Sequence, residues 1–214
     1  MKSPVREWAD LWRYGQKLLG SAYRKRAKRN PEAQPERAVE ALRAVLGHLG
    51  KKVILAGGLA VIAWGVERYT ADVDALGVPP DLLIELGEVA EGIGFAVPNP
   101  LLPEPLPNSD WLSKVTLTWR EGGAEIPVDL FVIDSEFLEE VELRAGKAGV
   151  DRVVTVEDLL LFKLIAGREK DRLDILSLMK LHFVTMNKPY LARWAKRLGV
   201  QDAWADLKEE HKLG

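Results

Sequence analysis

Between residues 53 and 133 the chain alternates short apolar runs with segments of helical periodicity, and this alternation constrains its fold more than any other feature. Short apolar runs bounded by glycine, proline or charged residues are typical of strands. We expect strands at 53–56, 72–76, 114–119 and 125–133, and helices at 59–64 and 80–92. Two glycines at 122–123 predict a hairpin, and five prolines within 98–108 predict an irregular loop. The middle of the chain therefore predicts a β-sheet with helices packed against it.

Helical segments flank this core on both sides. Apolar residues at helical spacing predict an amphipathic helix over 5–28, which two prolines separate from a second helix over 35–49. After Thr155, which fits the start of a capping box, helices are expected at 156–166, 169–183, 188–198 and 201–212. The expected fold is α+β, with an N-terminal helical arm (1–50), a mixed β-sheet core with flanking helices (51–150) and a helical C-terminal region (151–214).

The composition excludes several kinds of site. The chain has no cysteine, so neither disulfides nor thiolate metal sites can form, and its three scattered histidines do not suit a zinc site. Any metal is expected to be hard and bound by oxygen, which favours magnesium or manganese. The longest nearly apolar run, residues 53–66, is shorter than the roughly 20 residues that a membrane helix needs. With no apolar signal-peptide core near the start, we expect a cytoplasmic protein.

The net charge of -2 hides an uneven distribution of charge. Residues 1–29 contain nine Lys or Arg and two acids, a balance of +7, so the remaining residues carry -9. Five of these basic residues form a cluster over residues 24–29: Arg24, Lys25, Arg26, Lys28 and Arg29. Such a cluster either binds phosphate backbones or is the solvated end of a helix, and the sequence leaves both readings open.

A glycine pair follows the first expected strand. Gly57 and Gly58 let the backbone approach a ligand closely, and the helix that begins there offers free N–H groups to a phosphate. Glycine pairs at this position also serve packing alone. After thirteen intervening residues, Asp72 and Asp74 stand two apart on an expected strand, so both side chains project from one face. Two carboxylates this close repel one another unless a cation joins them.

A third acid lies in the last expected strand. Asp129 is the single charged residue of the run 128–133, and a lone buried carboxylate is costly unless it is paired or bound to metal. If this strand lies beside the strand of Asp72 and Asp74, the three acids converge. Such a cluster can hold two metal ions, which would clamp a triphosphate and activate an attacking hydroxyl.

These spaced motifs resemble the polymerase-beta-type nucleotidyltransferase superfamily. Residues 65–74 more specifically resemble the AbiEii-type toxins of abortive-infection systems, and residues 158–166 and 168–174 resemble the two downstream motifs of that group. The resemblance covers residues 52–180. It departs from the family at Gly58, where a serine is usual, and at the lysine motif, for which Lys114 is the candidate here.

The resemblance implies a role for each motif. Asp72, Asp74 and Asp129 would bind magnesium or manganese, and Asp129 could instead act as base on the acceptor hydroxyl. Lys163 would neutralise the triphosphate as transfer proceeds, unless it is a solvated helix lysine. Asp171 and Asp174 would form either an ion-pair network or part of the catalytic site. Further residues expected to contact the nucleotide are Gly57, Gly58, Arg68, Thr70 and Arg168, with the alternative that Arg68 and Thr70 only fix the turn before the metal-binding strand.

The implied activity is transfer of a nucleoside monophosphate from an NTP to an acceptor, with release of pyrophosphate. The acceptor could be tRNA or another RNA, with the protein acting as the toxin of a toxin–antitoxin pair and an antitoxin protein as its partner. A small molecule of the antibiotic type is the alternative acceptor. A third reading is a degenerate nucleotidyltransferase fold that only binds, and the presence of all three acids counts against it.

Overall fold

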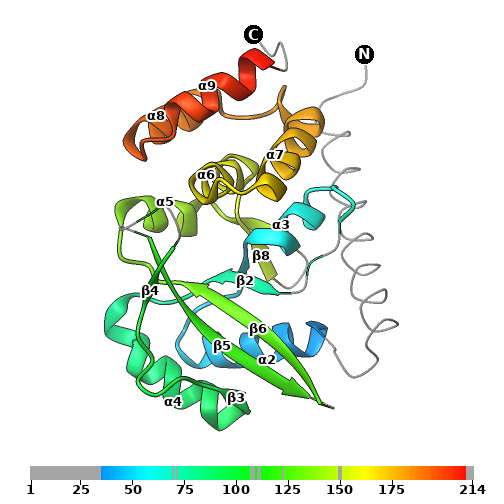
Figure 1. The fold of residues 1–214 in the computed structure, drawn as a ribbon. Coiled ribbons are helices and arrows are strands. Elements are labelled where there is room, and N and C mark those ends of the chain that lie inside the picture. Colours follow the sequence, from blue (N-terminus) through cyan, green and yellow to red (C-terminus); the bar gives the residue numbers. More distant parts are fainter. Residues whose placement is uncertain are drawn as a thin grey trace.

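The computed structural model of the protein describes residues 35–210 apart from nine: 69, 71, 107, 108, 110, 111, 122, 149 and 150. Within these residues a mixed β-sheet lies between helices on its two faces (Figure 1). The expected amphipathic helix over 5–28 and the basic cluster at 24–29 lie outside the described residues. The expected α+β fold, with a mixed sheet core and a helical C-terminal region, is confirmed.

The sheet contains eight described strands in the order β3-β5-β6-β2-β1-β8-β7, with β4 pairing with β5 beside this path. Their bounds are β1 Ile54–Leu55, β2 Val73–Leu76, β3 Phe95–Ala96, β4 Glu104–Pro105, β5 Ser113–Glu121, β6 Ala124–Phe131, β7 Gly146–Ala148 and β8 Asp151–Val153. The β5–β6 pair is an antiparallel hairpin, as expected, whereas β2 runs parallel to β6 and β1 parallel to β8. The parallel β2–β6 pair at the centre is what brings the acids together.

Eight α-helices and one 3-10 helix are described. They are α2 Pro35–His48, α3 Gly57–Ala63, η1 Pro80–Leu82, α4 Leu83–Ile93, α5 Glu136–Arg144, α6 Val156–Ala166, α7 Glu169–His182, α8 Lys188–Arg197 and α9 Gln201–Glu210. Helices α2 and α4 pack together against one face of the sheet, and α3 and α6 lie on the opposite face (Figure 1). No helix in this described part of the chain is long and apolar enough to cross a bilayer.

The two faces of the sheet differ because its central strands alternate in sequence. On β6, Ile126, Val128 and Leu130 are fully buried, whereas Asp129 on the other face is only partly buried. The same alternation on β5 buries Val115 and Leu117 and leaves Lys114 and Thr116 partly open. Since side chains alternate along a strand, one face forms the apolar core with α2 and α4, and the other presents polar groups toward α6.

Helix α6 is buried on all sides and connects the sheet to the C-terminal helices. Ten consecutive residues, from 156 to 165, are buried, which is typical of a central helix and not of a surface one. Its start is fixed by Thr155, whose hydroxyl oxygen accepts a hydrogen bond from the backbone N–H of Asp158 (3.3 Å), as the capping pattern predicted. Phe162 stacks on Phe131 of β6, so the helix is anchored directly on the sheet.

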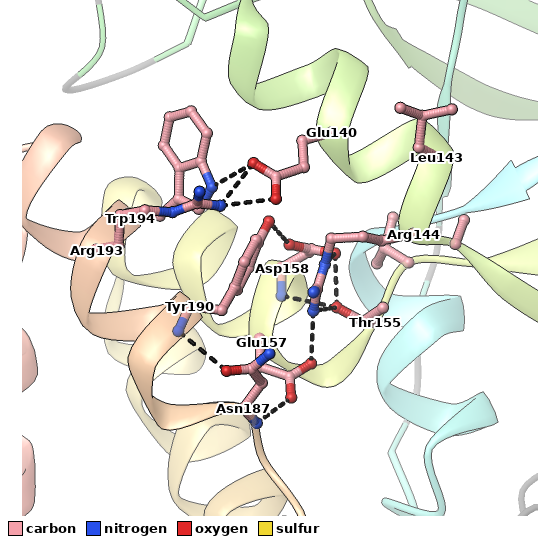
Figure 2. Close-up of polar contacts among 12 residues, drawn as sticks. Glu140, Leu143, Arg144, Thr155, Glu157, Asp158, Asn187, Tyr190, Arg193 and Trp194 are labelled. Atoms are coloured by element: carbon pink, nitrogen blue, oxygen red, sulfur yellow. Dashed lines mark hydrogen bonds and ion pairs between the residues drawn. The ribbon is translucent and has the colours of Figure 1, made fainter.

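A network of buried polar side chains ties α6 to α5 and α8 (Figure 2). The Asp158 carboxylate accepts hydrogen bonds from the Thr155 hydroxyl (2.6 Å) and from the Tyr190 hydroxyl, and Arg144 approaches it at 3.5 Å. The Arg144 guanidinium also lies over the Tyr190 ring, 3.5 Å from its centroid, and pairs with Glu157 at 3.3 Å. These contacts fix the position of α6, which carries several residues of the site described next.

Candidate active site

The three predicted acids converge on the face of the sheet that α6 covers. Strands β2 and β6 are parallel neighbours, and their register places Asp74 directly beside Asp129. Asp72 immediately precedes β2, two residues before Asp74. All three line one cavity of about 380 Å³ between the sheet, α3, α6 and the start of α7. The sequence predicted this convergence on condition that the two strands are neighbours, and they are.

Asp74 lies at the centre of this group and has few favourable partners. Its Oδ2 atom accepts one long hydrogen bond, at 3.4 Å, from the backbone N–H of Gly58 at the start of α3. Burial, followed by the charges of Asp72 and Asp129, raises the pKa of Asp74 from 3.8 to about 6. A cation bound beside Asp74 would reduce the repulsion between its carboxylate and those of Asp72 and Asp129.

Asp72 and Asp129 are each held by a threonine. The Thr70 hydroxyl donates to Asp72 Oδ1 and the Thr116 hydroxyl to Asp129 Oδ1, both at 2.7 Å. Burial tends to raise the pKa of Asp72, but its hydrogen bonds with Thr70 and its own backbone, and nearby positive charges, bring that pKa below its ordinary value. Lys114 forms an ion pair with Asp129.

Thr116 was missed by the sequence analysis, whereas Lys114 had been the candidate for the missing lysine motif. Both stand on β5, which pairs with β6 so that Thr116 is opposite Asp129 and Lys114 is opposite Phe131. Side chains directly opposite in an antiparallel pair share one face of the sheet. The alternation of side chains along β5 indicates that Thr116 lies on the same face as Lys114. It identifies Thr116 as a neighbour of Asp129 only once the register between β5 and β6 is known.

The glycine pair makes room for site side chains. A Cβ atom on Gly57 would lie 1.9 Å from Asp74 Oδ2, and one on Gly58 would lie 2.2 Å from Thr70 Oγ1. Gly57 also has φ +49°, a conformation that favours glycine. Close packing against Asp74 and Thr70 therefore requires both glycines. The predicted contact with phosphate at this turn stays a prediction.

Lys163 lies in a buried ion-pair network at the other wall of the cavity. Its Nζ is 2.6 Å from Asp174 Oδ2 and 3.1 Å from Asp171 Oδ1, and both aspartates are buried. Arg68 also pairs with Asp174, and Arg168 Nε lies 2.6 Å from Asp171 Oδ2. The ion-pair reading of Asp171 and Asp174 thus describes the observed contacts. Because Lys163 is buried, the reading of a solvated helix lysine is wrong.

The nine residues named as site candidates from the sequence all line this one cavity: Gly57, Gly58, Arg68, Thr70, Asp72, Asp74, Asp129, Lys163 and Arg168. Their catalytic and binding roles stay predictions. The described part of the proline-rich segment is irregular as expected apart from the two-residue strand β4, and it adds Glu104, Pro105 and Leu106 to the lining. Trp119 of β5 packs edge-to-face against Phe95 of β3.

The acids suit a hard cation by their chemistry. Carboxylate oxygens are preferred ligands of magnesium and manganese, and the raised pKa of Asp74 reflects its burial first and then the negative charges of Asp72 and Asp129. Among the described residues, no group of three or more Asp, Glu, His or Cys side chains is placed so that it could hold a metal ion as it stands. As they stand, Asp72 and Asp129 are each hydrogen-bonded to a threonine hydroxyl, that of Thr70 and that of Thr116.

No family model and no curated protein matches the chain. Similar solved structures include JHP933 from Helicobacter pylori (TM-score 0.47, 16% identity, covering 85% of this chain and 81% of that one). A second H. pylori structure, described as that of a candidate nucleotidyltransferase, has TM-score 0.44, 16% identity, and coverage of 81% and 79%. The polyadenylate synthase of Megavirus has TM-score 0.45, 11% identity, and coverage of 78% and 34%. Each TM-score is below 0.5, so the activity of this chain has to be inferred from its own residues.

Proposed function

We propose that the protein is a nucleotidyltransferase that moves a nucleoside monophosphate from an NTP to an acceptor hydroxyl and releases pyrophosphate. The observation that carries the proposal is the position of Asp74, beside Asp72 and Asp129 at the base of a cavity. A protein gains nothing in stability from three neighbouring carboxylates, whereas a site for a divalent cation and a triphosphate requires them. The resemblance of the spaced motifs to AbiEii-type nucleotidyltransferases supports the same conclusion.

The metal would be held by Asp72 and Asp74, and Asp129 would either assist them or act as the base. When bound, a magnesium or manganese ion supplies Lewis-acid stabilisation of the phosphoryl oxygens at which charge develops. Five cationic side chains line the same cavity and can neutralise a triphosphate: Arg68, Lys114, Lys163, Arg168 and Lys170. Lys163 and Arg168 are fixed by Asp171, so their charges are already in position before the nucleotide arrives.

The transfer step uses Asp129 as the proton acceptor. The acceptor oxygen forms a bond to the α-phosphorus of the NTP, and the bond from that phosphorus to the bridging oxygen of the β-phosphate breaks. The proton of the acceptor hydroxyl passes to Asp129, and pyrophosphate leaves with the electron pair of the broken bond. Thr116 orients the Asp129 carboxylate through its hydrogen bond at 2.7 Å.

For the acceptor we propose RNA, with tRNA as the first candidate and a toxin–antitoxin pair as the biological setting. The basic cluster at 24–29 supports an RNA acceptor, because phosphate contacts from Lys and Arg bind nucleic acid without regard to sequence. Replacing its five basic residues by serine should weaken RNA binding and flatten the dependence of affinity on salt. The affinity for NTP should stay unchanged, since the proposed triphosphate contacts are in the cavity.

The proposal is tested by incubating the protein with each of the four labelled NTPs, magnesium and total tRNA, in parallel with a panel of aminoglycosides. We expect labelled RNA and stoichiometric pyrophosphate, both absent for Asp129→Asn. A labelled aminoglycoside in place of labelled RNA would move the acceptor to the small-molecule class. NTP binding without incorporation into any acceptor would favour the degenerate binding module.

A further inference from the structure

The cavity has two chemically different ends. One end holds the acids, the glycine pair and the cationic side chains Arg68, Lys163 and Arg168. The other is lined by apolar groups: Pro105, Leu106, Phe131, Leu159 and Phe162. The nucleotidyl transfer proposed above uses the polar end alone, so the apolar end needs its own explanation.

The register of the sheet places the apolar end next to the acids. Phe131 follows Asp129 by two residues on β6 and therefore projects from the same face, one side-chain position further along the strand. Lys114 on β5 is directly opposite Phe131, and Glu104 on β4 is directly opposite Lys114. The backbone positions of Phe131, Lys114 and Glu104 thus form a row across three strands, roughly 7 Å along the sheet from the position of Asp129, and the Lys114 side chain reaches back to pair with Asp129.

Helix α6 forms the opposite wall of the cavity and also contributes both apolar and polar side chains. Leu159 and Phe162 line the apolar end, and Lys163 and Ala166 continue the same helix face toward the start of α7. The ring of Phe162 stacks on that of Phe131, with centroids 5.0 Å apart and planes 11° from parallel. Strand and helix therefore supply one aromatic wall, and Pro105 at the end of β4 and the following Leu106 add apolar lining.

We propose that this apolar end is a nucleobase subsite, which binds the base of a nucleotide whose phosphates, or whose acceptor hydroxyl, lie at the acids. This inference rests on the proposed function. A nucleobase is planar and apolar on its faces and polar at its edge, which fits an aromatic and aliphatic pocket with a polar row at one side. The subsite adjoins the acids, where the phosphates of the same nucleotide, or the hydroxyl of an acceptor terminus, would lie.

Glu104 is the group that would select the base. It is exposed at the rim, and no described residue pairs with its carboxylate. A carboxylate only accepts hydrogen bonds, so it favours a base edge that carries N–H donors. Guanine presents two adjacent donors, adenine and cytosine present an amino group, and uracil presents one N–H between two carbonyl oxygens. The expected order of preference is guanine first and uracil last.

The base could belong to the incoming NTP or to the terminal nucleotide of an RNA acceptor, and two measurements separate these sources. In the first, calorimetry without acceptor compares the four NTPs with inorganic triphosphate. In the second, kcat/KM is compared for short oligoribonucleotides that differ in their last base. The variants are Glu104→Gln and Phe162→Leu, and the control is Glu88→Gln, an exposed glutamate on α4 at the opposite face of the sheet.

If the subsite holds the NTP base, Glu104→Gln should reduce the preference among NTPs by about tenfold, and Phe162→Leu should weaken every NTP by about tenfold. Binding of inorganic triphosphate should be unchanged in both variants, and Glu88→Gln should behave like the wild type. If the acceptor base occupies the subsite, the same losses should appear in kcat/KM for the oligoribonucleotides instead. Unchanged preferences in both measurements would overturn the proposal. Base-selective NTP binding without transfer would retain the subsite and reject the enzyme.

Discussion

Two aspartates near α6, Asp158 and Asp74, are both removed from bulk water but have opposite surroundings. Asp158 is completely buried, and three donors reach it from α5, α8 and the cap of its own helix (Figure 2). The Asp74 carboxylate is buried as well, but it receives one long hydrogen bond and has two other acids beside it. Of these two buried carboxylates, that of Asp158 is the better satisfied one.

The difference shows that the partners of a buried acid indicate its use better than its depth does. A carboxylate surrounded by a hydroxyl, a phenol and a guanidinium is part of the fold, because its removal would leave those donors unpaired. A carboxylate surrounded by carboxylates has unfilled acceptor capacity and excess negative charge, which a bound cation would satisfy. Each of the following predictions separates these two kinds of acid.

The largest expected effect is on activity. Asp72→Asn and Asp74→Asn should each reduce nucleotide transfer by about a thousandfold or more, since each removes a metal ligand and a charge that only the reaction needs. Transfer from labelled NTP measures this loss, with Asp81→Asn as the control because Asp81 is exposed on η1. Either variant with the turnover of the wild type would refute the assignment of these acids.

The next largest effect is on the free energy of unfolding and concerns Asp158. Asp158→Ala should lower the free energy of unfolding by about 3–5 kcal/mol, because it leaves the Tyr190 hydroxyl and the Arg144 guanidinium without their buried partner. Urea unfolding of the variant beside Asp81→Ala gives the measurement. A loss below about 1 kcal/mol, the size of an ordinary surface change, would mean that the network does not hold the helices together.

A smaller effect is the change that Asp74 causes in the free energy of unfolding as pH changes. The pKa of Asp74 is about 6 in the folded protein against 3.8 ordinarily, so between these values the folded state binds more protons than the unfolded state. The stability contribution of Asp74 is therefore lost as pH rises through this window, and the metal-free protein should carry a penalty of about 1–3 kcal/mol above it. Asp74→Asn should remove the penalty, so that the variant is more stable than the wild type at pH 7.5 and closer to it at pH 4. Equal stability of the two proteins at both pH values would contradict this account.

Much of the fold and of the site follows from local pattern. The strands around Asp74 and Asp129 and the helices after Thr155 carry strong periodicity, and each appears close to its expected bounds. Helix α5 was missed, although Ser135 provides its N-cap, because charged residues fill its exposed face and weaken the apolar pattern.

The remaining parts depend on partners that are distant in sequence. Strand β4 forms in a proline-rich segment because its backbone pairs with β5, and no side-chain pattern signals that pairing. The strand β8 at Asp151–Val153 pairs with β1 and so extends the sheet into the segment expected to be helical. Tyr190, 32 residues after Asp158, could not be assigned to that acid before the packing of α8 on α6 was known.

The claim that the cavity acids form a cation site is tested most directly by manganese binding to the metal-free protein. Calorimetric titration with Mn²⁺ at pH 7.5 should show binding by the wild type and by Asp81→Asn, and at least tenfold weaker binding by Asp74→Asn, which lacks the central charged ligand. The accompanying thermal unfolding should show a Mn²⁺-dependent rise in Tm for the first two proteins alone. Equal Mn²⁺ affinity and equal stabilisation in Asp74→Asn would contradict the account.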